Sequence, residues 1–210
     1  MTDQILIIDY GVGNLFSLRS SFAAIGAEAV VSGDPAAVAE ARRLVLPGVG
    51  AFEDAAAKLR QTGLDRAVLD AAAKGTPLLG VCLGMQLLFD ESFEYGVHRG
   101  LGLIPGRVTP IAGRVPPDYK IPHIGWNALE KRGNSPLLRS IRDGDHVYFV
   151  HSYAAVDCEK HTVAVTEYGA SLTAAVQRDN VFGCQFHPEK SGDVGLRILK
   201  AFCELEEGPC

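Results

Sequence analysis

Short apolar runs alternate with stretches of helical periodicity in the first half of the chain. Apolar runs without polar alternation are typical of strands that are buried on both faces of a sheet. These strands are expected at residues 4–9, 29–31, 44–46 and 77–81. Helices are expected at residues 15–24, 35–41, 52–74 with a break near Gly63, and from 85 to 89. This alternation predicts an α/β fold with an open, mostly parallel, doubly wound sheet.

The second half has a different pattern. From residue 100 to about 186, the apolar runs are short, rich in β-branched residues and separated by turn residues. Such runs predict antiparallel strands and hairpins, which we expect to be added to the same sheet. They are expected at residues 147–150, 162–168, 172–176 and 181–186. A closing helix is expected at 192–204, and because no repeat or linker divides the chain, residues 1–210 are predicted to form a single domain.

Composition and charge narrow the classes of function. Hydrophobic residues make up 47% and charged residues 21% of the 210 residues, as in an ordinary folded protein rather than a disordered one. A formal net charge of −5 gives no basic surface for nucleic acid. No apolar run could span a bilayer, and the first residues lack the pattern of a secretory signal. We therefore expect a cytoplasmic protein that binds neither nucleic acid nor membranes.

The five cysteines do not predict a disulfide framework or a zinc site, because their number is odd and no CxxC pair occurs. Only Cys82 lies between two glycines at a strand-to-helix junction. Cys158, Cys184 and Cys203 are expected to be packing residues, and Cys210 an exposed terminal thiol.

No segment predicts a metal or a cofactor. The histidines lack metal-binding spacing such as HExxH. Residues 11–13 begin like a dinucleotide-binding fingerprint, but Phe16 stands where the third glycine would be. A tight turn, or a loop offered to a partner, is the better interpretation of this segment.

Two motifs supply a nucleophile, a base and a carboxylate. Residues 80–84 place Cys82 between glycines at a sharp strand-to-helix turn, where the helix N-terminus favours a thiolate. His187 follows a strand and can take the thiol proton, while Glu189 can orient the imidazole. Pro188 biases His187 toward extended backbone, so positions 187 and 189 should point to one side. Since ligands bind at the carboxyl edge of such sheets, these side chains should meet there.

Two further segments each allow two interpretations of their role. Residues 47–50, Pro-Gly-Val-Gly, end a strand and form either an ordinary β-turn or a turn that directs an amide toward an oxyanion. His151 also follows an apolar strand and rivals His187 as the base, although no carboxylate lies two residues beyond it.

Together, the cysteine turn, the PGVG turn and the HPE box resemble those of class I, triad-type glutamine amidotransferases. Within this family, several segments resemble the glutaminase subunits of imidazole glycerol phosphate synthases, which act in histidine biosynthesis. These segments are residues 8–14, 47–52, 80–88, 121–127, 148–153 and 185–191. The resemblance covers essentially the whole chain, and its one small departure is Val12, where some relatives carry proline.

The resemblance implies a flavodoxin-like glutamine amidotransferase fold and a glutaminase activity. Glutamine would be hydrolysed to glutamate and ammonia through a γ-glutamyl thioester on Cys82, with His187 transferring the proton and Glu189 orienting His187. The implied oxyanion hole consists of Gly48, Val49 and Leu83. The implied substrate-binding residues are Gln86, Glu94, Ser152 and Tyr153.

The resemblance also implies a partner. Ammonia that escapes into water is protonated and loses its nucleophilic lone pair, so a synthase needs a sealed route to its second active site. The implied partner is a (β/α)-barrel cyclase subunit in a one-to-one heterodimer, which makes imidazole glycerol phosphate and aminoimidazole carboxamide ribotide. The implied interface residues are Asn14, His146, Tyr148 and Lys190. Activity would be low until the partner and its ligand bind, with a flip of the Gly48–Val49 peptide as the switch.

Three alternatives remain at this stage. The chain could be a glutaminase for another synthase, making pyridoxal phosphate, anthranilate or guanylate, although PGVG and HPEKS speak against it. It could be a stand-alone γ-glutamyl hydrolase that needs no partner. It could also be an inactive binding subunit, against which the complete set of Cys82, His187 and Glu189 argues.

Overall fold

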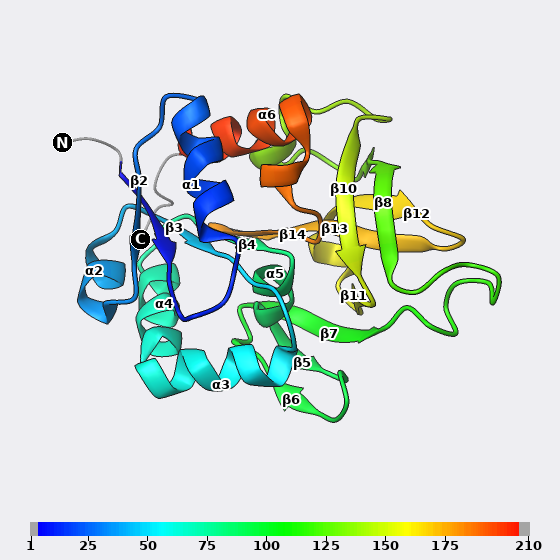
Figure 1. Ribbon diagram of the computed structural model, residues 1–210, viewed down its shortest axis with the longest axis horizontal. Helices are drawn as coiled ribbons and strands as arrows, with labels where there is room; N and C mark the ends of the chain where they lie inside the picture. Colours follow the sequence, from blue (N-terminus) through cyan, green and yellow to red (C-terminus); the bar gives the residue numbers. More distant parts are fainter. Residues whose placement is uncertain (1–3, 206–210) are drawn as a thin grey trace.

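An eight-stranded sheet forms the centre of the computed structural model, which describes residues 4–205 (Figure 1). Its strand order is β2-β1-β3-β4-β14-β13-β12-β9. The strands are β1 (Ile5–Ile8), β2 (Ala29–Ser32), β3 (Arg43–Leu46), β4 (Leu78–Val81), β9 (Glu130–Lys131), β12 (Thr162–Glu167), β13 (Ser171–Arg178) and β14 (Val181–Cys184). The first five in this order are parallel and the last three are joined by antiparallel pairing, which confirms the predicted class of sheet.

Helices cover both faces of this sheet. The helices are α1 (Leu15–Ala24), α2 (Pro35–Glu40), α3 (Phe52–Thr62), α4 (Leu64–Ala73), α5 (Leu83–Leu87) and α6 (Gly192–Cys203). Figure 1 shows α1 and α6 on one face and α3, α4 and α5 on the other. Across residues 4–205, none of the helices is long and apolar enough to cross a membrane.

The two helical layers explain why the first strands have no polar alternation. Ile5 and Ile7 of β1 pack in the core under α1 and α6, whereas Leu6 and Ile8 pack in the core that includes α3 and α4. Successive side chains of a strand point to opposite faces, so a strand covered on both faces needs apolar residues at every position.

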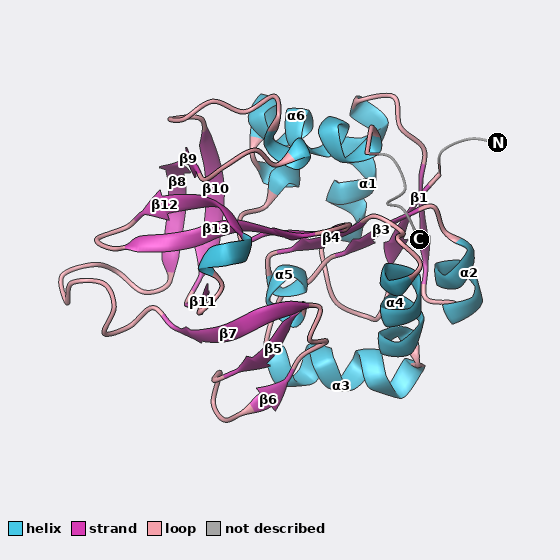
Figure 2. Cartoon of the chain, turned by 180° about the vertical axis from the view of Figure 1, so that it is seen from behind, coloured by secondary structure: helices cyan, strands magenta, loops and turns pink. Residues whose placement is uncertain are grey.

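Two smaller sheets flank the central one. One pairs β8 (His123–Ala128) with β10 (His146–His151), and the other has the order β11-β7-β5-β6. The members of the second are β5 (Phe89–Ser92), β6 (His98–Arg99), β7 (Ile104–Pro110) and β11 (Tyr153–Val156). In Figure 2, β5, β6 and β7 lie on the same side of the central sheet as α3 and α4, and β8 and β10 lie at the opposite end from α2.

These smaller sheets correct the prediction for the second half. The strand expected at 147–150 belongs to β10, outside the central sheet. The strand expected at 181–186 is β14, which pairs antiparallel with β13 as predicted but also pairs parallel with β4. Composition identifies a strand but not its partner or direction, because these depend on how the chain returns between strands.

The helix expected at 85–89 is also corrected. Helix α5 begins at Leu83, directly after Cys82, and Phe89 starts β5. Every residue from Leu83 to Phe89 is buried, so the hydrophobic pattern has no period that could locate the helix ends. The predicted break at Gly63, with φ of 72°, and the closing helix α6 are confirmed. The tail after Leu205, including Cys210, lies outside the described residues.

The N-cap of α2, Asp34, provides a test of local stability. The Asp34 carboxylate accepts a hydrogen bond of 2.9 Å from the backbone N–H of Ala36, and Pro35 occupies the first helical position. Replacing Asp34 by alanine leaves that N–H unpaired, so we expect the free energy of unfolding to fall by about 1 kcal/mol. Urea denaturation of both proteins measures this loss, and an unchanged midpoint would contradict a capping role.

Candidate active site

Cys82 forms a strained turn between β4 and α5. Its backbone has φ of 55° and ψ of −111°, a conformation that residues with a side chain rarely adopt. The flanking glycines allow the chain to pass close to itself. A Cβ on Gly84 would lie 1.8 Å from the carbonyl oxygen of Leu46, and a Cβ on Gly80 would lie 2.7 Å from that of Gly84. The turn is therefore a nucleophile elbow, which presents the cysteine above the sheet edge.

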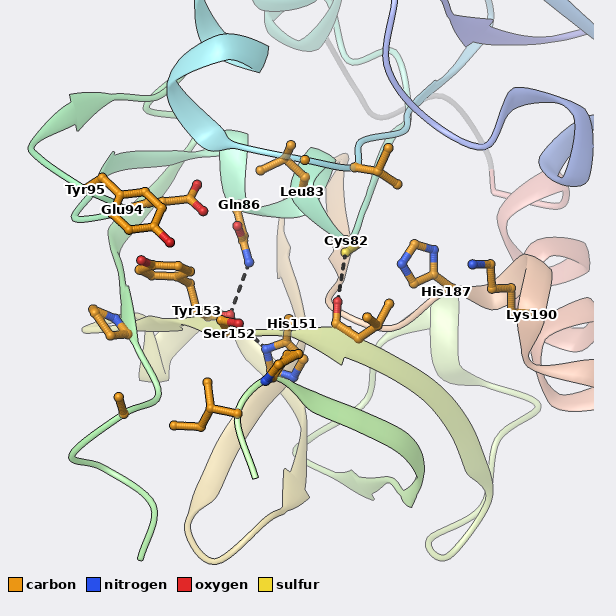
Figure 3. Close-up of a pocket in the computed structure, with 17 residues that line it drawn as sticks. Cys82, Leu83, Gln86, Glu94, Tyr95, His151, Ser152, Tyr153, His187 and Lys190 are labelled. Carbon is orange, nitrogen blue, oxygen red and sulfur yellow. Dashed lines mark hydrogen bonds between the residues drawn. The ribbon is translucent and has the colours of Figure 1, made fainter. Parts of the chain in front are cut away.

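The strand β14 brings His187 and Glu189 to the same edge. Cys184 at the end of β14 pairs with Val81 at the end of β4, and its carbonyl accepts a 2.8 Å hydrogen bond from the N–H of Cys82. Beyond β14, Nδ1 of His187 lies 2.8 Å from Oε1 of Glu189. These two side chains are 3% and 1% exposed. The predicted trio is thus assembled at one place, with a carboxylate held against the imidazole. Figure 3 shows Cys82 and His187 of this trio.

The surroundings of His187 favour its charged form. Burial lowers the pKa of the imidazole, but the hydrogen bonds with Cys82 and Glu189 outweigh burial and raise the pKa to about 9. These interactions favour the imidazolium form of the ring beside the Cys82 sulfur. Such a cation stabilises a thiolate, which is the nucleophilic form of cysteine.

This pKa predicts a dependence of stability on pH. The pKa of His187 is about 9 in the folded protein and about 6.5 when unfolded, so its contribution is complete below pH 6.5 and is lost as the pH rises through about 9. From about pH 6 to pH 10, we expect the wild type to lose roughly 1–3 kcal/mol more unfolding free energy than His187→Gln. Urea titrations at both pH values measure this difference, and parallel losses in the two proteins would contradict it.

A cavity of about 610 Å³ opens beside Cys82 and His187 (Figure 3). The predicted substrate-binding residues all line it. They are Gln86, Glu94, Ser152 and Tyr153. Within the protein, Nε2 of Gln86 donates to the carbonyl oxygen of Tyr153 at 3.2 Å, and a carboxylate oxygen of Glu94 accepts a hydrogen bond of 2.6 Å from the N–H of Phe52. The cavity therefore combines the reactive sulfur with polar groups suited to a small amino acid.

The predicted oxyanion residues lie at different depths. Val49 and Leu83 line the cavity, whereas Gly48 packs behind it. A Cβ on Gly48 would lie 2.7 Å from the backbone nitrogen of Gly84 and 2.9 Å from the hydroxyl of Tyr10. That hydroxyl donates a 2.6 Å hydrogen bond to the carbonyl oxygen of Pro47, so Tyr10 holds the PGVG turn against the elbow. No sequence motif indicates this role of Tyr10, because its partner lies 37 positions away along the chain.

His151 lines the cavity but is poorly suited to be the base. Its Nδ1 lies 2.8 Å from the carbonyl oxygen of Tyr153, and its Nε2 lies 3.0 Å from Nδ1 of His123. Burial is the main reason why its pKa falls to about 4, so the ring is neutral and weakly basic near pH 7. Both ring nitrogens are engaged away from Cys82, and the geometry favours His187.

The predicted interface residues come from three segments. Tyr148 of β10 lies opposite Trp126 of β8, and the Lys190 ammonium lies 5.8 Å from the centre of the Tyr148 ring. His146 is exposed at the start of β10, and Asn14 precedes α1 without capping it through its side chain. Only Tyr148 and Lys190 are seen in direct contact with each other.

Gln185 is a further residue near the sulfur that the sequence analysis did not single out. Its side chain is fully buried, and its Nε2 lies 3.8 Å from Sγ of Cys82. Within residues 4–205, no group of three or more His, Cys, Asp or Glu side chains is placed to hold a metal ion.

Comparison with known proteins agrees with this geometry. The family model "Glutamine amidotransferase class-I" matches residues 6–204. The "Imidazole glycerol phosphate synthase subunit HisH" of Geobacillus thermodenitrificans is 52% identical, over 96% of each chain. The protein of the same name from Wolinella succinogenes is 48% identical, over 95% of this chain and 98% of its own.

Solved structures share the fold at lower identity. "Structure of PurLQS from Thermotoga maritima" superposes with a TM-score of 0.76 and 19% identity, over 96% of this chain and 98% of that chain. "Crystal structure of glutamine amidotransferase" has a TM-score of 0.73 and 19% identity, over 94% and 98% of the two chains.

Proposed function

This chain belongs to the class I glutamine amidotransferase family, and we propose that it is the glutaminase subunit of an imidazole glycerol phosphate synthase in histidine biosynthesis. The proposal of glutaminase activity is based on the assembly of Cys82, His187 and Glu189 beside a cavity. The identity of the synthase rests on the relatives, which are about half identical over nearly the full chain.

In the proposed mechanism, the Cys82 thiolate attacks the side-chain amide carbon of glutamine. The carbonyl π electrons move to oxygen, and the tetrahedral intermediate then collapses as the carbon–nitrogen bond breaks. His187 donates its proton to the leaving nitrogen, which departs as ammonia and leaves a γ-glutamyl thioester. Water next attacks the thioester with His187 as base, and glutamate leaves as the thiolate is restored. Glu189 keeps the imidazole oriented and stabilises its charged form throughout.

The oxyanion of both tetrahedral intermediates needs hydrogen-bond donors close to Cys82. Leu83 opens α5, where the first backbone N–H groups have no partner within the helix, so its amide is available to the oxyanion. A second donor would come from the Gly48–Val49 peptide. Flipping of this peptide is the proposed switch, and the glycine lowers its cost because it tolerates both orientations.

The glutamine backbone is proposed to lie among the other polar groups of the cavity. Gln86 and Glu94 would bind the amino acid part, and the backbone at Ser152 and Tyr153 would meet its carboxylate. This arrangement would leave the side-chain amide within reach of the sulfur.

A subunit of a synthase needs a partner that consumes the ammonia, here proposed to be a (β/α)-barrel cyclase in a one-to-one complex. Exposed apolar side chains support a docking surface. Phe16 on α1 is 82% exposed, and Ile124 and Trp126 on β8 are 56% and 52% exposed. Trp126 also packs against Tyr148, which adjoins Lys190 at the cavity rim. Docking there would cover the route by which ammonia leaves the sulfur.

Glutamine hydrolysis by the purified chain tests this proposal. We expect little glutamate from the chain alone, and strong stimulation by the cyclase subunit together with its ribotide ligand. Rapid hydrolysis without a partner would instead indicate a stand-alone γ-glutamyl hydrolase. Stimulation only by the partner subunit of another synthase would reassign the pathway.

A further inference from the structure

Gln185 directly follows the last residue of β14 and lies close to the reactive sulfur. Its backbone N–H donates to the carbonyl oxygen of Ala174 at 2.8 Å, which extends the pairing of β14 with β13 past its last residue. The side chain has no exposed surface. A buried primary amide must find partners for its polar atoms, and one of those partners is Sγ of Cys82.

The orientation of the Gln185 amide follows from its neighbours. Nε2 of Gln86 donates to the carbonyl oxygen of Tyr153 at 3.2 Å and to Oε1 of Gln185 at 3.0 Å. Because a backbone carbonyl only accepts, the nitrogen of Gln86 must face Tyr153, and the oxygen of Gln185 must then face Gln86. Nε2 of Gln185 is consequently the atom directed at the sulfur.

The sulfur therefore lies between one acceptor and two donors. The carbonyl oxygen of Val150 is 3.9 Å from Sγ, as the dashed line in Figure 3 marks, and can accept only from the protonated thiol. The donors to the sulfur are the amide N–H of Gln185, with Nε2 at 3.8 Å, and the ring of His187, which interacts with Cys82. The carbonyl favours the thiol, and the donors favour the thiolate.

We propose that Gln185 is a catalytic residue that donates a hydrogen bond to the Cys82 thiolate and so sustains the nucleophile together with His187. This role rests on the proposed function, in which Cys82 is the nucleophile. Gln86 acts on the sulfur indirectly, as a positioning residue, because it orients the Gln185 amide from the wall of the substrate cavity.

The rate of alkylation of Cys82 by iodoacetamide, followed against pH, tests this proposal without glutamine or a partner. Modification is quantified on the peptide that carries Cys82, so the other thiols do not contribute. Gln185→Met keeps an unbranched side chain of similar length but removes the donor. We expect the pH midpoint of alkylation to rise by about one unit, which makes the reaction about tenfold slower at pH values below the wild-type midpoint.

Two more variants complete the experiment. Gln86→Met leaves the Gln185 amide unoriented and should shift the midpoint in the same direction by a smaller amount. Gln177→Met is the matched control, because this amide lies on the neighbouring strand β13 and donates to the carbonyl oxygen of Asp179 in an exposed position. It should keep the wild-type profile.

The outcomes separate this inference from the proposed function. If Cys82 of the wild type is alkylated no faster than an ordinary thiol at neutral pH, the nucleophile assignment fails and the proposed function fails with it. If the wild type reacts rapidly and a folded Gln185→Met has the same profile, the role of Gln185 is overturned. Should Gln185→Met not fold, an unchanged profile in Gln86→Met overturns it equally.

Discussion

Replacing Cys82 by alanine is expected to lower kcat for glutamine hydrolysis by at least about 10⁴-fold. The thioester cannot form without the sulfur, and neither His187 nor Glu189 can substitute for it, because their side chains are paired with each other and nearly fully buried. The assay is glutamate release by the partner-activated complex. Circular dichroism of the variant establishes that the fold is kept.

Cys184 provides the matched control for this substitution. It lies on the neighbouring strand β14, it is fully buried, and burial raises its pKa well above that of an ordinary thiol. Its sulfur lies 3.8 Å from the carbonyl oxygen of Gly80 and takes no part in the proposed chemistry. Cys184→Ala should therefore retain hydrolysis. If Cys82→Ala kept a tenth of the wild-type rate, the nucleophile would have to be sought elsewhere.

Gly84→Ala is expected to lower the free energy of unfolding by about 3 kcal/mol or more. The added methyl would lie 1.8 Å from the carbonyl oxygen of Leu46, and the atom it meets is backbone of the buried strand β3. Relief would require the elbow and β3 to move apart, which would also displace the sulfur. Urea denaturation measures the loss of stability, and hydrolysis by the variant measures the displacement.

Gly133→Ala separates this effect from the general cost of replacing glycine. Gly133 has φ of 75°, but a Cβ there would meet nothing within 4 Å, so only backbone strain is added. We expect a loss of about 1 kcal/mol from that strain. Equal losses in the two variants would show that the contact with Leu46 is relieved at little cost.

The parts of the fold that sequence patterns predicted are those where burial or local hydrogen bonds decide the structure. Strand β1 must be apolar at every position because helices cover both of its faces, and Asp34-Pro35 starts a helix through local bonds. The direction of β14 could not be read in this way. It pairs parallel to β4 and antiparallel to β13, and its composition is compatible with either direction.

The residues of the candidate site show the same contrast between groups that local sequence motifs identify and groups that only the packed structure places. Cys82, His187 and Glu189 lie in short motifs at strand ends, which local sequence identifies, and they meet because β4 and β14 run parallel and end at the same edge of the sheet. Gln185 and Tyr10 act through side chains whose partners are distant in sequence, and only the packed structure orients them. Local motifs thus locate the reacting groups, whereas their supporting groups require the three-dimensional arrangement.

The strained backbone of Cys82 limits how far the thermal stability of this protein could be raised. A residue with a side chain at φ of 55° and ψ of −111° costs the folded state on the order of 1–3 kcal/mol, and glycine would avoid most of that cost. Selection for thermal resistance alone would therefore favour removing the very thiol on which turnover depends. The cysteine is retained against the preference of the fold, so engineering for heat tolerance must gain its stability at other positions.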